Sequence, residues 1–310
     1  MSTRPETLPA PPVPTTQPLP WGRRYLAVSP DHFRIDYAIN PFMHLDDQPD
    51  PVRTREQWAA MVAAIEAAGA SVEVLGQLAE APDMVYAMNL GLALEREDGS
   101  PHVVLSHMRH AERRMETPAA ERWWADRGAT TQRTGRDGVG AHLEAGDAFA
   151  WRGDLVVGFG PRTEELALKH LATELGTTVR GFRIVHPGMY HMDLGFCPLD
   201  DTRAMVCPAA YDEASAAALL DLVPEPLVLT EDEAMTFCAN SVVVGRTVVM
   251  PACPDRVRAQ LEEWGFEVVV VDVSELLKGG GAVRCLTNPL DVRLGRDLRP
   301  VPGGGVVLPS

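Results

Sequence analysis

Cysteine is scarce in this sequence and gives no sign of a disulfide or zinc framework. Only five cysteines occur in 310 residues, and no two are spaced as C-x-x-C. An odd number excludes a fully paired disulfide framework, and without C-x-x-C pairs a zinc ribbon is a poor interpretation. We therefore expect the protein to work in a reducing compartment, the cytoplasm. The five cysteines are Cys197, Cys207, Cys238, Cys253 and Cys285.

Long apolar runs and excess positive charge are also absent. No apolar run reaches the length of about 18 residues that a transmembrane helix needs, and the N-terminus lacks the apolar segment of a secretory signal. The chain has 28 Lys and Arg against 43 Asp and Glu, a net charge of −15. This charge repels nucleic acids and anionic membranes, so neither is expected as a partner. It suits a small cationic substrate.

The common nucleotide-binding and hydrolase motifs are missing. No G-x-G-x-x-G follows a strand-like segment, and there is no Walker motif and no G-x-S-x-G elbow. Hairpin candidates at 149–159, 194–207 and 241–250 predict antiparallel strand pairs. Together these observations disfavour a doubly wound dinucleotide-binding fold.

A unit of a helix followed by a strand recurs about five times. Glycines directly follow four of the helices and stop them, with stop signals about 40–60 residues apart, a period typical of propellers and solenoids. We therefore predict an α/β fold, a five-bladed α/β propeller of repeated strand–helix–strand units, with an ordinary three-layer α/β sheet as the alternative. The predicted helices are 53–68, 112–127, 162–175, 212–222 and 254–264, and the strands after four of them are 71–75, 179–185, 226–229 and 266–271.

Proline and glycine mark the two ends of the chain. Residues 1–20 contain seven prolines, which remove backbone donors, so we expect a disordered tail there. Residues 291–310 contain Pro300, Pro302 and three consecutive glycines, and they are expected to form a C-terminal extension. Residues 21–290 are expected to form a single domain.

The most unusual segment is K-G-G-G-A-V-R-C-L-T, residues 278–287. Three glycines allow a close approach of the backbone to another group. Arg284 stands beside Cys285, and a cation near a thiol favours the nucleophilic thiolate. The alternative is a glycine turn before a strand that carries a buried, inert cysteine.

Four other polar segments are candidates for a site. His191 and Asp193 would share one face of an extended segment, and Glu144 lies three residues before Asp147 in E-x-G-D. Asp83 and Asn89 bound an apolar run, and 109–114 is a basic cluster in an acidic chain. The alternatives are a surface histidine, an acidic turn, a core strand and a salt-bridged helix start.

A zinc site at His107 and His110 is disfavoured. The H-x-x-H spacing places two ligands on one face only in a helix, whereas the residues before it, 103–106, are strand-like. A metal-binding or non-catalytic α/β protein is kept as the alternative from another functional class.

These segments, taken in order, resemble one known arrangement. An acidic strand, E-x-G-D, H-x-D and then G-G-G-x-x-(R/K)-C-x-T resemble the guanidino-group-modifying (pentein) enzymes: dimethylarginine dimethylaminohydrolases, arginine deiminases and amidinotransferases. The resemblance extends from Tyr25 to Leu290 and is closest to bacterial dimethylarginine dimethylaminohydrolase-like proteins. The fold of that family is a five-bladed α/β propeller, which agrees with the five repeated units.

The resemblance implies a role for eight residues. It implies that Cys285 is the nucleophile, that His191 is the general acid/base and that Glu144 holds both the guanidinium and His191. It implies that 21–290 is a catalytic domain. The substrate-binding residues that it implies are Asp83, Asn89 and Asp193, with Arg109 and Arg162 near the carboxylate end of the substrate.

The predicted activity is that of a cysteine hydrolase on a guanidino substrate. A methylated arginine or arginine would give citrulline and an amine through a covalent thiouronium on Cys285, without a metal or organic cofactor. Many relatives carry Asp where this chain has Asn89, so an arginine or citrulline hydrolase that continues to ornithine is an alternative. An amidinotransferase is another, because an amine can replace water. A homo-oligomer is left open.

Overall fold

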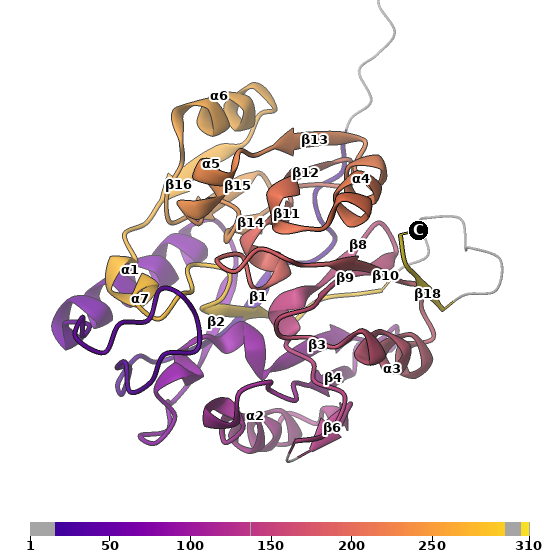
Figure 1. Ribbon diagram of the computed structural model, residues 1–310. Helices are drawn as coiled ribbons and strands as arrows, with labels where there is room; N and C mark the ends of the chain where they lie inside the picture. Colours follow the sequence, from indigo (N-terminus) through magenta and orange to yellow (C-terminus); the bar gives the residue numbers. More distant parts are fainter. Residues whose placement is uncertain (1–15, 137, 295–304, 310) are drawn as a thin grey trace, which may run out of the picture.

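The computed structural model describes residues 16–136, 138–294 and 305–309. In this part of the chain the strands form five sheets of three or four strands and one two-stranded ribbon. The protein is therefore an α/β protein, and the alternative of one continuous three-layer sheet is wrong for the described residues, because the five sheets are separate. Figure 1 shows the helices α1, α2, α3, α4 and α6 around the outside of the molecule.

Each of the five sheets repeats one arrangement of strands. In the second, β3 (Gly91–Glu95) pairs antiparallel with β4 (Pro101–Leu105), α2 (Glu116–Ala125) crosses over, and β5 (Thr130–Arg133) pairs parallel with β4. A short turn suffices for the antiparallel pair, whereas the parallel strand needs a crossover connection. The same order is found in β8 (Ala148–Trp151), β9 (Asp154–Phe159), α3 (Glu165–Leu175) and β10 (Val179–Arg183); in β11 (Phe196–Pro198), β12 (Arg203–Val206), α4 (Glu213–Leu222) and β13 (Glu225–Val228); and in β14 (Val242–Val244), β15 (Thr247–Met250), α6 (Asp255–Glu263) and β16 (Glu267–Val270).

The first sheet joins the two ends of the folded chain. Strand β1 (Arg24–Val28) pairs antiparallel with β17 (Thr287–Pro289) and parallel with β2 (Ser71–Leu75), which follows α1 (Pro51–Ala67). Tyr25 lies opposite Pro289 in the register. The hairpin that the other sheets form from consecutive residues is thus made here from segments about 260 residues apart.

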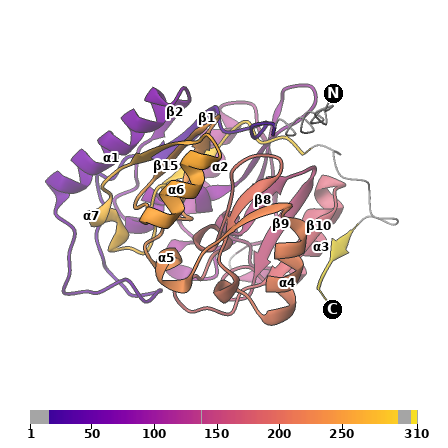
Figure 2. The same ribbon diagram turned by 90° about the horizontal axis from the view of Figure 1, so that it is seen from above.

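Burial falls from the first to the third strand of each sheet. Strands β8, β11, β14 and β17 are buried along their whole length, whereas β2, β5, β13 and β16 are half-buried or exposed at most positions. The first strands therefore lie inside the molecule; Figure 2 shows one of them, β8, beside β9 and β10 of its own sheet. A side chain just before a first strand therefore lies in the interior of the molecule.

The predicted helices are confirmed with small shifts at their ends. The Asp50 side chain caps α1 by accepting from the backbone N–H groups of Val52 and Arg53, so α1 begins two residues before the predicted helix. α3 ends at Gly176 in the left-handed conformation, with φ at 59°. The helix predicted from residue 112 begins only at Glu116, because 111–113 form a separate 3₁₀ turn.

The ends of the chain differ in part from the expected tails. Residues 1–15, 295–304 and 310 lie outside the described residues. Within the predicted tail, however, Leu19 is buried in the core and Pro18 forms a β-bridge with Asp200, so ordered structure begins before residue 21. Near the C-terminus, β18 (Val306–Val307) adds a parallel strand to β10. None of the helices in the described ranges is long and apolar enough to cross a membrane.

Candidate active site

Six polar residues, five of them candidates from the sequence, occupy equivalent places in the five sheets. Each lies in the turn that leads into a buried first strand, two to five residues before it. Because the first strands lie inside, these five turns meet although they are far apart in the sequence. The turns carry Asn89 before β3, Glu144 before β8, His191 and Asp193 before β11, Asn240 before β14 and Cys285 before β17.

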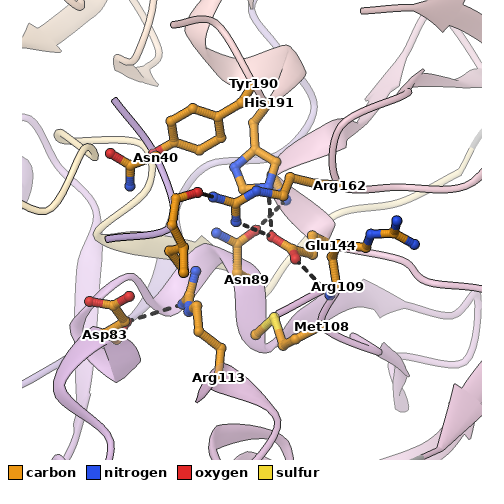
Figure 3. A network of polar contacts seen from close by, with 12 residues as sticks. Asn40, Asp83, Asn89, Met108, Arg109, Arg113, Glu144, Arg162, Tyr190 and His191 are labelled. Atoms are coloured by element: carbon orange, nitrogen blue, oxygen red, sulfur yellow. Dashed lines mark hydrogen bonds and ion pairs between the residues drawn. The ribbon is translucent and has the colours of Figure 1, made fainter. Parts of the chain in front are cut away.

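His191 and Glu144 form a buried pair. Nε2 of His191 lies 2.8 Å from Oε2 of Glu144, and Nη1 of Arg162 donates to the same oxygen at 3.1 Å (Figure 3). Burial by itself would raise the pKa of Glu144, but Arg162 and His191 hold it well below its usual range. The ionised carboxylate accepts a hydrogen bond from Nε2–H, which leaves Nδ1 of His191, without a partner among the described residues, as the nitrogen that can exchange a proton.

Cys285 lies between an amide and a carboxyl group. Its Sγ is 3.1 Å from Nδ2 of Asn240 and 3.4 Å from Oδ2 of Asp193. Burial raises the pKa of the Cys285 thiol well above its usual value, and Asp193 raises it further. Arg284 lies over the ring of Phe149 at 4.8 Å and does not offset these effects. The expectation that Arg284 produces the thiolate is therefore not met in this state of the protein.

Gly146 is the point where the remaining polar groups converge. Its backbone N–H donates to Oδ1 of Asn89 at 3.0 Å. A Cβ at this position would lie 3.0 Å from that oxygen and 3.3 Å from both Oδ2 of Asp193 and Nδ1 of His191. Only glycine leaves this space open. Oδ2 of Asp193, which borders this space, also lies 3.4 Å from the Cys285 sulfur.

The charge of Asp193 responds to this environment. Burial raises its pKa to about 7, and its Oδ1 has no partner among the described residues. A cation placed beside Asp193 would restore the ionised form, because opposite charges favour each other's ionisation. The arrangement thus places a carboxyl group that a bound cation would ionise 3.4 Å from the Cys285 sulfur.

Asp83 lies within a second buried cluster. Burial raises its pKa to about 6, and its Oδ1 has no partner among the described residues. Arg113 donates from Nη2 to the backbone oxygen of Asp83 at 3.1 Å and forms a buried ion pair with Glu116. In Figure 3 the Arg113 guanidinium lies between Asp83 and Asn89.

The arginine cluster at 109–114 contributes differently from the sequence-based prediction. The Arg109 guanidinium is half-exposed and pairs with Glu164 at 3.3 Å, away from Glu144 (Figure 3). Only its backbone N–H joins the site, by donating to Oε1 of Glu144 at 2.9 Å. Arg113 is the member of the cluster whose side chain is buried, and it was not singled out by the sequence.

The triple glycine packs against aromatic and amide side chains. Gly280 has φ at 88°, and a Cβ there would lie 2.6 Å from Oδ1 of Asn40 and 2.7 Å from the Tyr190 hydroxyl. Asn40 donates to the Gly279 carbonyl at 3.0 Å, and Tyr190 donates to the Gly280 carbonyl at 2.5 Å. The close backbone approach expected of this segment is confirmed, and its partners are side chains of the protein.

The zinc alternative receives no support from the described residues. They contain no cluster of three His, Cys, Asp or Glu side chains able to hold a metal ion. Nδ1 of His107 lies 3.0 Å from the Ala141 carbonyl, and its Nε2 accepts from the Gly138 N–H at 3.0 Å. Both ring nitrogens of His107 are therefore engaged.

Comparison with known proteins gives a consistent set of relatives. Residues 29–292 match a family model described as eukaryotic N,N-dimethylarginine dimethylhydrolase. An N(G),N(G)-dimethylarginine dimethylaminohydrolase of Mycobacterium tuberculosis is 34% identical over 270 residues, which cover 86% of each chain. The bifunctional arginine dihydrolase/ornithine cyclodeaminase AgrE of Nostoc sp. is 32% identical over 272 residues, 85% of this chain but only 37% of that protein.

Solved structures agree with these relatives. The product-bound N-terminal domain of ArgZ, an arginine dihydrolase from the ornithine–ammonia cycle in cyanobacteria, has a TM-score of 0.82 and 32% identity, covering 88% of this chain and 98% of that one. A dimethylarginine dimethylaminohydrolase adduct with 4-chloro-2-hydroxymethylpyridine has a TM-score of 0.69 at 20% identity, over 86% and 99% of the chains. The latter supports the fold alone.

Proposed function

This chain belongs to the dimethylarginine dimethylaminohydrolase family, and from that premise we propose that it hydrolyses a C–N bond of a guanidino substrate, a methylated arginine or arginine, with Cys285 as nucleophile. One observation carries the proposal. The His191–Glu144 pair and the Cys285–Asp193 pair come from three turns, with His191 and Asp193 in the same one, and they meet around Gly146. A nucleophile, a proton carrier and a carboxyl group for a cation are thus within one buried space.

The proposed reaction begins with binding of the cation. A guanidinium beside Asp193 brings positive charge close to Sγ, which favours the thiolate that the buried site otherwise disfavours. The thiol proton passes to Nδ1 of His191, and the thiolate attacks the guanidinium carbon and forms a C–S bond. The proton on Nδ1 then passes to the departing amine as the C–N bond breaks, leaving an S-alkylthiouronium on Cys285.

Hydrolysis of this intermediate completes the cycle. Nδ1 of His191 takes a proton from a water molecule, whose oxygen forms a bond to the same carbon. The C–S bond then breaks, which releases the ureido product and returns the sulfur of Cys285. Glu144 keeps the His191 ring in one tautomer throughout, because its ionised carboxylate accepts from Nε2. Every step uses groups of this chain, the substrate and water.

The far end of the substrate is assigned to Arg113 rather than Arg109. Arg113 uses Nε and Nη2 for Glu116 and the Asp83 carbonyl, and its Nη1 takes part in none of these contacts. That Nη1 is available for the α-carboxylate of an amino acid. Asp83, whose Oδ1 has no partner among the described residues although the Tyr37 hydroxyl lies near its carboxyl group, is available for the α-ammonium group. The solvent-facing side chain of Arg109 supports no such role.

The finer features of the protein follow from the same proposal. We infer that the five sheets are the blades of an α/β propeller, supported by their common strand order and by the pairing of β1 with β17 from opposite ends of the chain. We also infer a cytoplasmic location, supported by five cysteines that form no disulfide. The expected substrate class is a small cationic amino acid.

A second activity is favoured by the orientation of Asn89. The Gly146 N–H can only donate, so Oδ1 of Asn89 must face it and Nδ2 is the end available to a ligand. A donor at this position suits the carbonyl oxygen of a ureido group better than the N–H groups of a guanidinium. We therefore infer that citrulline formed in the first reaction is a substrate for a second hydrolysis to ornithine.

Parallel assays test the proposal. Arginine, N,N-dimethylarginine and citrulline are incubated separately with the protein, and citrulline, ornithine and released amines are identified by mass spectrometry. We expect Cys285→Ser to abolish turnover and Cys253→Ser, a change at a half-buried cysteine with its sulfur 3.9 Å from the Pro254 carbonyl, to leave it intact. Substantial activity in Cys285→Ser would remove Cys285 from the mechanism.

A further inference from the structure

Asn240 is the polar residue with the most contacts to the proposed nucleophile and its turn, and no motif in the sequence pointed to it. It is completely buried in the turn between α5 (Glu231–Met235) and β14. Its Oδ1 accepts from the backbone N–H groups of Ala282 and Cys285, both at 3.1 Å. Its Nδ2 donates to the Asp193 carbonyl at 3.2 Å and to Sγ of Cys285 at 3.1 Å.

We propose that Asn240 is a catalytic residue that holds the Cys285 turn in place and supplies the hydrogen-bond donor that stabilises the Cys285 thiolate. The proposal rests on the function proposed above, in which Cys285 is the nucleophile. It adds a residue with two separable contributions, because one end of the amide contacts the backbone and the other contacts the sulfur.

The orientation of the amide is fixed by its partners. Two backbone N–H groups need an acceptor, so the oxygen of the Asn240 side chain must face Ala282 and Cys285. The NH₂ group is thereby directed at Sγ. The Arg284 N–H also donates to the Asn240 backbone oxygen at 3.1 Å, so three N–H groups of the segment 282–285 are tied to this one residue.

A donor at this place matters because the sulfur is buried. A thiolate at Cys285 has little access to water, and an unsolvated charge is costly unless a hydrogen bond compensates it. In the thiol form the S–H group donates to Oδ2 of Asp193. When the proton leaves, this hydrogen bond is lost, so the thiolate must be stabilised by a donor on a different side of the sulfur. Asn240 is that donor, and its effect on the Cys285 pKa is to lower it.

A neutral donor also fits the substrate. Lysine or arginine beside the sulfur would favour the thiolate more strongly, but either would repel a guanidinium. The Asn240 amide contributes N–H groups without net charge, so it stabilises the thiolate without opposing the cation. The positive charge that completes thiolate formation can then come from the substrate itself.

The experiment measures the thiol directly, without substrate. Asn240→Asp keeps an oxygen for the two backbone N–H groups and replaces the donor to Sγ by a carboxylate. Alkylation of Cys285 by iodoacetamide is followed against pH by mass spectrometry of the peptide that contains it. We expect the alkylation midpoint to rise by about one pH unit or more, and kcat at pH 7 to fall about tenfold or more. Ser241→Ala, a change at the neighbouring buried hydroxyl that donates to the Cys238 carbonyl, should change neither.

A second variant covers the case in which Asn240→Asp does not fold. Asn240→Ser shortens the side chain so that its hydroxyl falls short of Sγ, and the same rise in the alkylation midpoint is expected. An unchanged midpoint in whichever variants fold, as judged by circular dichroism, would overturn the proposal and reduce Asn240 to a structural role. Failure of the proposed function is a different result: it would appear as turnover by Cys285→Ser, whatever the alkylation profiles are.

Discussion

Nε2 of His191 lies 2.8 Å from Oε2 of Glu144, and neither side chain has appreciable contact with solvent. A carboxylate in this position determines which ring nitrogen carries the proton and stabilises the imidazolium when it forms. Arg162 compensates the buried negative charge from the other side of the same oxygen. In the mechanism proposed above, the three residues act as one unit, in which His191 transfers protons and the other two hold its ring and charge state.

Glu144→Gln is expected to lower kcat by a factor of about 10² to 10³. Glutamine keeps the shape but cannot stabilise an imidazolium, and it leaves the buried Arg162 without a counter-charge. Steady-state kinetics with the best substrate measure the effect. The matched control is Glu165→Gln, at a half-exposed glutamate on the neighbouring helix α3, which should retain wild-type rates. A kcat near wild type in Glu144→Gln would contradict the role of the pair.

Substitutions of Arg113 and Arg109 are expected to have different effects on KM. Arg113→Lys keeps the charge but loses the guanidinium fork that binds Glu116 and leaves Nη1 for a substrate. We expect it to raise KM about tenfold or more, with a smaller change in kcat. Arg109→Ala removes only a half-exposed ion pair with Glu164 and should change KM by less than about threefold. The reverse result would restore the prediction made from the sequence. Thermal unfolding of both variants shows whether the buried Arg113 site still folds.

These two arginines show what a sequence can and cannot predict here. The order of Glu144, His191 and Cys285 in their motifs identified the chemistry, and the recurring stop glycines identified the repeated units. Which arginine of the 109–114 cluster points inward is decided by the 3₁₀ turn Ala111–Arg113, whose geometry leaves no pattern in the sequence.

Asn240 was missed for a different reason. Its partners are 42 to 47 residues away in other turns, and an asparagine beside an apolar strand has no signal of its own. The helix starts that were misplaced depended on local contacts, such as the Asp50 cap. Long-range contacts made by a single amide are thus the part of the site that only the folded chain shows.

Asp147→Asn is expected to change the pH dependence of stability. Burial raises the pKa of Asp147 from its usual 3.8 to about 7. Between pH 3.8 and about 7 the carboxyl group is ionised in the unfolded protein but protonated in the folded protein. The stability of the folded wild type is therefore highest below pH 3.8 and decreases as the pH rises to about 7. Asparagine keeps an oxygen for the Met192 N–H, which donates to Asp147 at 2.9 Å, and does not titrate.

The variant should therefore gain stability relative to wild type as pH rises from 4 to 7, on the order of 1 kcal/mol per pH unit. Urea unfolding at several pH values measures the difference. Asp126→Asn, at an exposed position after α2, serves as the control, for which a nearly constant difference is expected. A constant difference for Asp147→Asn as well would show that Asp147 is ionised in the folded protein.

Asn89 is expected to control how far the reaction proceeds. Its Oδ1 is held by the Gly146 N–H at 3.0 Å, so Asn89→Asp keeps that contact and replaces the donor that faces the substrate by a second carboxylate oxygen. A carboxylate favours the cationic guanidinium and disfavours the carbonyl oxygen of citrulline. We expect wild type to convert arginine through citrulline to ornithine, and Asn89→Asp to stop largely at citrulline, with the ornithine-to-citrulline ratio falling about tenfold or more.

Products are quantified by mass spectrometry over time, with citrulline also supplied as the substrate. Wild type that yields citrulline only, from every substrate, would contradict the two-step activity. Ornithine production at an equal ratio in Asn89→Asp would instead show that Asn89 only orients the Gly146 turn, and the choice of product would then depend on how water reaches the thiouronium at Cys285.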